Sequence, residues 1–499
     1  METNLKHSGT RSTEVCQREI DHAVFAREAA EEGIVLLKNE GLLPLKKDTK
    51  IALLGIGAEK TIKGGTGSGD VNNRESVSIY AGMKEKNADI VSEEWLKDYH
   101  NRYEQARTEW KEQILEAAKH VDNPFDAYAA NPFAMPDGRA VTNEDIKAAE
   151  AAIYVISRIS GEGKDRRKRK GDYYLSDQEE KDLYFLNEQK IPTVLIINAG
   201  GPVELTDLLA GTENICAILN ISQLGQEGGR AVARILLGEA VPSGKLTTTW
   251  AKKYEDYPTA GNFLQDFNKA VYTEGIYVGY RYFDTFNVEP GYPFGYGLSY
   301  TTFALGNLEA SLDEDTLVLG VTVENTGAFA GREVVQVYVS APVSEMDMPE
   351  QELKGFQKTM LLAPGEKEDI KIRIPLRNLA SYSENAGGYI LSKGDYGVRI
   401  GTSSRDTKPV CKIRLEQTAL TEQVLVELPL TETLEEKKGL TDRKDETIWK
   451  DVPVLLAVQI PETLDSRSAY SDEKVVTYAT DTSYQPVMPY ETVRYVEKK

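Results

Sequence analysis

One acidic residue stands between two glycines in a segment whose composition could support acid–base chemistry. The segment from Ser160 to Arg166 reads Ser-Gly-Glu-Gly-Lys-Asp-Arg and follows the apolar run from Ala152 to Ile156. A carboxylate flanked by glycines can project from a loop without crowding its own backbone. Glu162 could therefore act as a general acid where its surroundings raise its pKa. The pattern also fits an ordinary solvated turn, because the chain carries 79 acidic residues.

A second candidate is the glycine-rich segment from Lys63 to Asp70, which follows the apolar run from Ile51 to Leu54. Its glycines would let the backbone approach a ligand closely. A flexible connection without a ligand fits the same residues. A third candidate, the tyrosine-rich segment from Tyr277 to Tyr300, suits either a sugar-binding surface or a packed junction between domains.

Other chemistries fit the sequence poorly. Gly55-Ile56-Gly57 lacks the third glycine of a dinucleotide fingerprint and has Lys60 in its place. The segment from Gly238 to Lys245 misses the spacing of a phosphate-binding loop, and Leu246 stands where serine or threonine is needed. The four histidines and three cysteines show no metal-ligand spacing. We therefore expect no metal and no organic cofactor.

Composition excludes several classes of partner. The 499 residues carry 59 basic against 79 acidic side chains, a net charge of −20. Nucleic acids and anionic membrane surfaces need a surplus of cations, so we expect neither as a partner. The basic run from Lys164 to Lys170 reads as a solvated loop. With no signal peptide, no membrane span and three scattered cysteines, the sequence predicts a soluble cytoplasmic protein.

The elements that must position these residues alternate between strands and helices in the first 300 residues. Buried strands are expected near 51–55, 152–156, 194–198 and 215–221. A helix and its exit are expected over 21–45, ended by Gly41 and Pro44. Further helices are expected over 92–120, 176–187 and 228–237, the second of these opened by a Ser176–Glu179 capping box, with a loop over 121–143. Strands that are apolar on both faces and alternate with helices predict an α/β fold with a parallel sheet covered on both sides.

After about residue 300 the pattern changes to period-two alternation, as in Val335 to Val339 and Ile370 to Ile374. Such runs separated by glycine-containing turns predict an all-β sandwich. The expected domains are an α/β sandwich over 20–300, a β-sandwich over 301–418 and an extended strap or linker over 419–499.

Several of these segments together resemble glycoside hydrolase family 3, the β-glucosidase and β-xylosidase family. The resemblance is carried by the entry segment 26–45, the loop 63–71, the markers at 225–229 and 242–246, the aromatic segment 279–300, and the segments 353–365 and 394–396. It covers roughly residues 20–418. It implies the family's second, α/β-sandwich domain followed by a fibronectin-III-like domain.

The resemblance also implies roles for individual residues. In many family members a glutamate on a loop of this α/β domain is the general acid/base, and 161–166 looks like that loop, which makes Glu162 the catalytic candidate. The implied substrate-binding residues are Lys63, Gly65, Ser68, Asp70, Asp165 and Arg166.

The family's nucleophile is an aspartate on a (β/α)₈ barrel, which needs roughly 250 residues. No such barrel precedes residue 20, and the sequence after 418 has no room for one. We therefore expect one component of a retaining β-glycosidase that acts on a β-linked oligosaccharide or an aryl or alkyl glycoside. Its expected partner is a barrel chain or, since a bare face would be adhesive, a second copy. The alternative is a non-catalytic carbohydrate-binding or assembly module.

Overall fold

The structure is a computed structural model that describes residues 13–161, 165–263, 270–344, 346–424, 435–439, 446–466, 474–479 and 492–497. For the last two ranges, and for Ser68, Ala129 and Glu446, only the backbone is described. The chain divides into two compact units. Unit 1 comprises Met1–Tyr254, Tyr296–Thr302 and Asn325–Arg332, and unit 2 comprises the rest of the chain.

Unit 1 is built on a six-stranded sheet in the order β1-β6-β5-β4-β2-β3. Its strands are β1 (Val35–Asn39), β2 (Lys50–Leu54), β3 (Asp89–Ile90), β4 (Ala151–Arg158), β5 (Thr193–Ala199) and β6 (Ile215–Asn220). Strands β4 and β5 are buried along their whole length, as their continuous apolar runs predicted. The pairs β2–β4, β4–β5 and β5–β6 are parallel, which confirms the predicted α/β fold.

Strand β1 is the one antiparallel member of this sheet, and it pairs with β6. The sequence pattern predicted the exit of a helix over Val35 to Leu37, because this apolar run fits the period of a helix as well as that of a strand. Helix α1 (Gln17–Gly33) instead ends at Gly33, and the run that follows fills the sheet edge beside β6.

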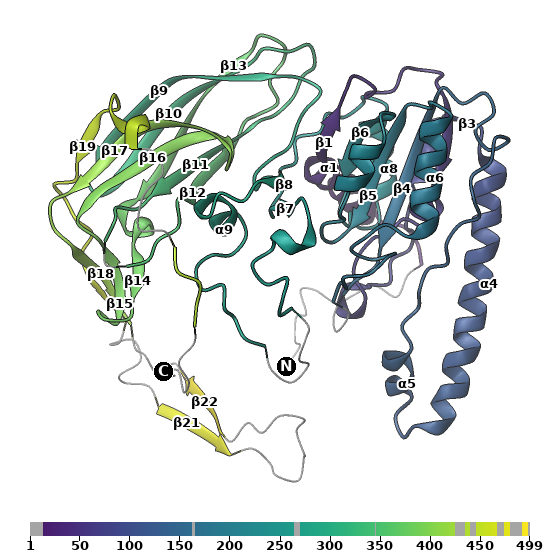
Figure 1. Cartoon of the computed structure of the whole chain (residues 1–499), viewed down its shortest axis with the longest axis horizontal. Helices are drawn as coiled ribbons and strands as arrows, with labels where there is room; N and C mark the ends of the chain where they lie inside the picture. Colours follow the sequence, from purple (N-terminus) through teal and green to yellow (C-terminus); the bar gives the residue numbers. More distant parts are fainter. Residues whose placement is uncertain are drawn as a thin grey trace. The chain divides into compact units, whose positions relative to one another are not determined.

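Helices connect and cover these strands (Figure 1). They are α1, α2 (Ile56–Glu59), α3 (Ile79–Glu85), α4 (Glu93–Ala117), α5 (Pro124–Ala130), α6 (Asp177–Glu188), α7 (Thr206–Gly211) and α8 (Gly228–Leu236), with 3₁₀ turns η1 (Gly67–Gly69), η2 (Ala118–His120) and η3 (Tyr254–Asp256). Ser176 and Glu179 form the predicted capping box at the start of α6. No helix in the described part of the chain combines the length and apolarity that a membrane crossing needs.

Helix α5 corrects the loop predicted over 121–143. Pro124 occupies the first helical position, where its missing N–H costs nothing. Asn123 caps the helix by accepting a hydrogen bond from the N–H of Phe125 at 3.1 Å. Helix α4 extends well beyond the sheet and meets α5 near its end (Figure 1).

Unit 2 is dominated by a β-sandwich. Its sheets have the orders β13-β10-β9, β12-β11-β16-β17-β19 and β14-β15-β18-β20. The strands are β9 (Phe303–Asp313), β10 (Thr316–Asn325), β11 (Val334–Ser340), β12 (Glu352–Lys358), β13 (Lys367–Pro375), β14 (Ser381–Ser383), β15 (Gly388–Leu391), β16 (Gly394–Ser403), β17 (Asp406–Leu415), β18 (Ala419–Gln423), β19 (Val454–Leu456) and β20 (Leu464–Asp465). Alternate residues of β10 and β13 face one hydrophobic core, which confirms the predicted β-rich part.

The remaining elements are short. They are α9 (Tyr280–Thr285), η4 (Leu376–Leu379), η5 (Glu446–Trp449), the strands β7 (Trp250–Ala251) and β8 (Pro290–Tyr292), and a hairpin of β21 (Lys474–Ala479) and β22 (Thr492–Glu497). Strand β19 pairs in parallel with β17 and so extends the five-stranded sheet. The domain boundaries predicted from the sequence stay a prediction.

Candidate active site

The candidate residues of unit 1 follow the carboxyl ends of its parallel strands. The glycine-rich loop 60–78 follows β2 and α2, the segment 159–175 follows β4, and two further loops follow β5 and β6. In open α/β sheets, ligands collect at this edge. A tight turn leads from β2 into α2, because Gly55 has a φ of +86° and a side chain there would lie 2.4 Å from the carbonyl oxygen of Val155.

The glycine-rich loop lies directly against the residues that precede Glu162. Thr66 and Gly161 form a parallel β-bridge, and the N–H of Thr66 donates to the carbonyl of Ser160 at 3.1 Å. A Cβ on Gly161 would lie 2.3 Å from backbone atoms of Thr66, and one on Gly65 would lie 2.8 Å from the carbonyl oxygen of Ser160. Both glycines are therefore required by the close approach of two backbones. The two segments singled out from the sequence meet at this bridge.

Gly161→Ala is expected to separate the two segments and to speed hydrogen exchange of the Thr66 amide at least tenfold, since the new methyl group collides with fixed backbone atoms. Gly69→Ala is the matched control, because a Cβ on Gly69 meets nothing within 4 Å. The control should keep the exchange rate of that amide within about twofold. Equal exchange rates in the two variants would show that the bridge does not matter.

Lys63 and Asp70 close the glycine-rich loop on itself. The ammonium of Lys63 donates to the carbonyl of Val71 and to Oδ1 of Asn73, each at 2.5 Å, and lies 3.5 Å from Oδ1 of Asp70. The side chain of Asp70 is 62% exposed, so it remains available to a ligand. Ser68 lies in the turn η1, and its side chain is outside the described residues.

Glu162 also lies outside the described residues, together with 163 and 164. Of its predicted neighbours, Asp165 is exposed. Arg166 pairs with Asp172 and donates to the carbonyl oxygens of Gly201 at 3.3 Å and Pro202 at 3.1 Å. Its contacts join the segments that follow β4 and β5.

Asn198, which was not predicted as a site residue, connects several loops at this edge of the sheet through its side-chain hydrogen bonds. It is fully buried near the end of β5, and its Oδ1 accepts from the N–H of Ile62 at 2.7 Å and from the hydroxyl of Ser157 at 2.8 Å. Its Nδ2 donates to the carbonyls of Ile62 at 3.0 Å and Ser222 at 2.7 Å. One side chain thus ties three strand ends together. In the sequence, the signal for this role is a single amide side chain within an apolar strand.

Two further polar groups at this edge lack partners. Oγ1 of Thr66 and Nε2 of Gln223 are buried without a hydrogen bond to any part of the chain that the structure describes. The carboxamide of Gln223 and the hydroxyl of Ser160 both lie close to Gly200, within 3.7 Å of where its Cβ would be. Buried polar groups without partners are rare in native proteins. A hydroxyl-rich ligand could satisfy both of them.

A buried ion pair between Arg158 and Glu179 stabilises the end of β4. Arg158 and Glu179 are 5% and 4% exposed and form two hydrogen bonds of 2.7 and 2.6 Å. Arg158 also donates to the carbonyls of Asp172 at 2.8 Å and Tyr174 at 3.3 Å. This pair fixes both ends of the segment that carries Glu162, Asp165 and Arg166.

Among the described residues, no group of three or more His, Cys, Asp or Glu side chains could hold a metal ion.

Two features define the class of protein. They are an open α/β sheet with a glycine-rich loop at its strand ends and a β-sandwich that follows it along the chain. The Glycosyl hydrolase family 3 C-terminal domain matches residues 34–300, and the Fibronectin type III-like domain matches residues 333–404. The chain belongs to glycosyl hydrolase family 3.

Its relatives include Beta-glucosidase A of Butyrivibrio fibrisolvens, which is 35% identical over 479 residues, 87% of this chain and 56% of the relative. A beta-glucosidase of Ruminococcus albus is 33% identical, over 81% of this chain and 42% of the relative. The structure of beta-glucosidase 3B from Thermotoga neapolitana in complex with alpha-D-glucose matches with a TM-score of 0.70 at 41% identity, over 80% of this chain and 55% of that one. The chain thus spans about half the length of the curated relatives it matches.

Proposed function

We propose that this chain supplies the acid/base half of a retaining β-glycosidase of the β-glucosidase type. Glu162 would protonate the glycosidic oxygen as the bond breaks and would then, as a base, activate the water that hydrolyses the glycosyl-enzyme. The observation that carries the proposal is the bridge between Thr66 and Gly161, which sets the residue directly before Glu162 against the glycine-rich loop. Relatives that are beta-glucosidases support the substrate class.

The nucleophile is proposed to come from a (β/α)₈ barrel, on a further part of the same polypeptide or on a separate chain. Retaining chemistry needs a second carboxylate about 5–5.5 Å from the first. The parallel sheet that the structure describes in unit 1 is open, with β1 and β3 at its edges. An open sheet has no closed barrel to carry such a nucleophile.

The sugar would lie against the glycine-rich loop. We propose that Gly65, Ser68 and Asp70 contact it, with Lys63 and Arg166 holding their loops in place through the contacts described above. Asp165, exposed beside the Glu162 segment, completes the proposed set. Thr66 and Gln223 join them because their unpartnered polar atoms would gain hydrogen bonds from sugar hydroxyls. The cytoplasmic location expected from the sequence stays a prediction.

The test is to assay this chain on aryl β-glucosides alone, with a family 3 barrel as a separate protein, and fused to that barrel. Activity is expected only where the barrel is present. If neither combination with the barrel hydrolyses the substrate but the chain still binds sugar, the chain is better described as a carbohydrate-binding or assembly module. Activity of the 499-residue chain alone would overturn the need for a barrel.

A further inference from the structure

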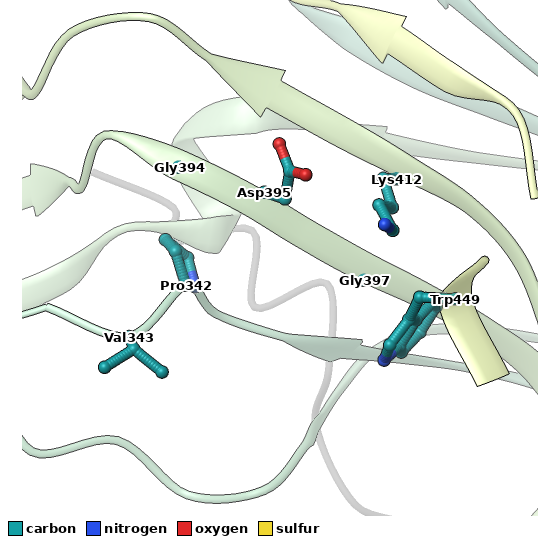
Figure 2. A pocket seen from close by; sticks show the side chains of 7 residues that line it. All are labelled: Pro342, Val343, Gly394, Asp395, Gly397, Lys412 and Trp449. Carbon is teal, nitrogen blue, oxygen red and sulfur yellow. The ribbon is translucent and has the colours of Figure 1, made fainter. Parts of the chain in front are cut away.

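The outer face of the β-sandwich in unit 2 carries a hollow of about 360 Å³. Figure 2 shows Trp449 at one end, Pro342 and Val343 at the other, and the side chains of Asp395 and Lys412 on the neighbouring strands β16 and β17. Gly394 and Gly397 of β16 complete the lining. The volume lies within the range of sites for small ligands, roughly 300–1,000 Å³.

The hollow depends on its two glycines. A Cβ on Gly397 would lie 2.4 Å from the indole ring of Trp449, and one on Gly394 would lie 2.6 Å from the ring of Pro342. Any side chain at Gly397 or Gly394 would displace Trp449 or Pro342, which line the hollow. Trp449 is only 7% exposed, so its position at the edge of the hollow is held by packing. The cavity is therefore a defined feature of the fold.

Two charged side chains face this hollow without forming an ion pair. Asp395 is already held by Arg414, whose Nε and Nη2 donate to its two oxygens at 2.7 and 2.8 Å. These hydrogen bonds lower the pKa of Asp395, so the carboxylate stays ionised. Lys412 attracts the carboxylate of Asp395 electrostatically, but its ammonium makes no side-chain hydrogen bond with any residue that the structure describes. Nearby Arg399 is occupied by Glu350 at 2.7 Å.

This arrangement selects a class of ligand. Asp395 offers only acceptors and Lys412 only donors. The carboxylate of Asp395 is already paired with Arg414, so an ammonium group would gain little from it and would also meet Lys412. An anion would pair with Lys412 but would leave the acceptor oxygens of Asp395 unused. A hydroxyl group can donate to one side chain and accept from the other. The apolar surfaces of Pro342 and Val343 match the C–H groups of a sugar ring.

We infer that this hollow is a binding site for a neutral saccharide, one or two rings long, on the β-sandwich of unit 2. Lys412 donates to ring hydroxyls, and Asp395 accepts from them. The inference stands independently of the function proposed for unit 1.

The probe is cellotetraose, titrated into the 499-residue chain by isothermal calorimetry. Lys412→Met is expected to weaken binding at least fivefold, and Val343→Trp, at a position that is 65% exposed, is expected to fill the hollow and abolish binding. Lys408→Met is the matched control, since Lys408 lies on the same strand outside the hollow, and it should stay within about twofold.

Two further titrations separate this site from the alternatives. The weakening caused by Lys412→Met should be the same in the parent chain and in the Glu162→Gln background, which distinguishes the hollow from the site proposed in unit 1. Tetragalacturonate or L-glutamine binding more tightly than cellotetraose would overturn the inference. So would unchanged cellotetraose binding in Val343→Trp, or no binding to the parent chain.

Discussion

Glu162→Gln is expected to lower kcat/KM of the barrel-containing enzyme by about 10²–10⁴-fold on alkyl β-glucosides, the usual range for a lost general acid. The loss should shrink on dinitrophenyl β-glucoside, because that leaving group departs without being protonated. The falling alkaline limb of the kcat/KM profile should also disappear. A general acid works while protonated, so activity normally falls as the pH rises through its pKa.

Glu213→Gln is the matched control for this substitution. Glu213 is an exposed residue that precedes β6, at the opposite edge of the sheet from the glycine-rich loop. The activity of the Glu213→Gln variant should be unchanged on both substrates. A loss in Glu162→Gln that is the same for good and poor leaving groups would argue that Glu162 only supports the fold.

Arg158→Met is expected to destabilise unit 1 by about 3–5 kcal/mol, because it leaves the carboxylate of Glu179 buried without its cation. The amides of β4 and β5 should report this loss in hydrogen exchange read by mass spectrometry, while those of β11 and β16 should not. The segment 159–175 should lose protection as well, because Arg158 also holds the carbonyls of Asp172 and Tyr174.

Two comparisons make this prediction specific. Lys170→Met removes an exposed pair with Asp177 and Glu180, and it should leave the protection of β4 and β5 unchanged. Replacing both Arg158 and Glu179 by apolar residues should recover part of the loss, since no unpaired charge remains. If Arg158→Met leaves exchange unchanged, the pair contributes nothing to the support of this strand end.

The sequence predicted the parts of unit 1 that depend on local pattern. The apolar runs of β4 and β5 and the Ser176–Glu179 capping box required no information about distant residues. Helix α5 was missed because prolines and asparagines were read as loop residues, although Pro124 and Asn123 begin a helix there. Strand β1 was missed because its pairing with β6 joins residues about 180 positions apart in the chain.

The candidate site also combines features that local sequence patterns predict with features that depend on residues far apart in the chain. The glycine pattern indicated the two loops, and their place after parallel strands indicated one sheet edge. The bridge between Thr66 and Gly161 depends on the registers of β2 and β4, which no local pattern encodes. Asn198 was read as one more residue of a buried strand, yet its amide holds both Ile62 and Ser222. Its role appears only once these segments are assembled.

The most direct measurement of the central claim is azide rescue of Glu162→Ala in the barrel-containing enzyme, with the product identified by NMR. Azide needs no general base, so it should attack the glycosyl-enzyme where water cannot. We predict that turnover of dinitrophenyl β-glucoside rises with azide and yields β-glucosyl azide, the product of retention. No rescue, or the α-glucosyl azide expected when the nucleophile is lost, would contradict the assignment of Glu162 as the acid/base.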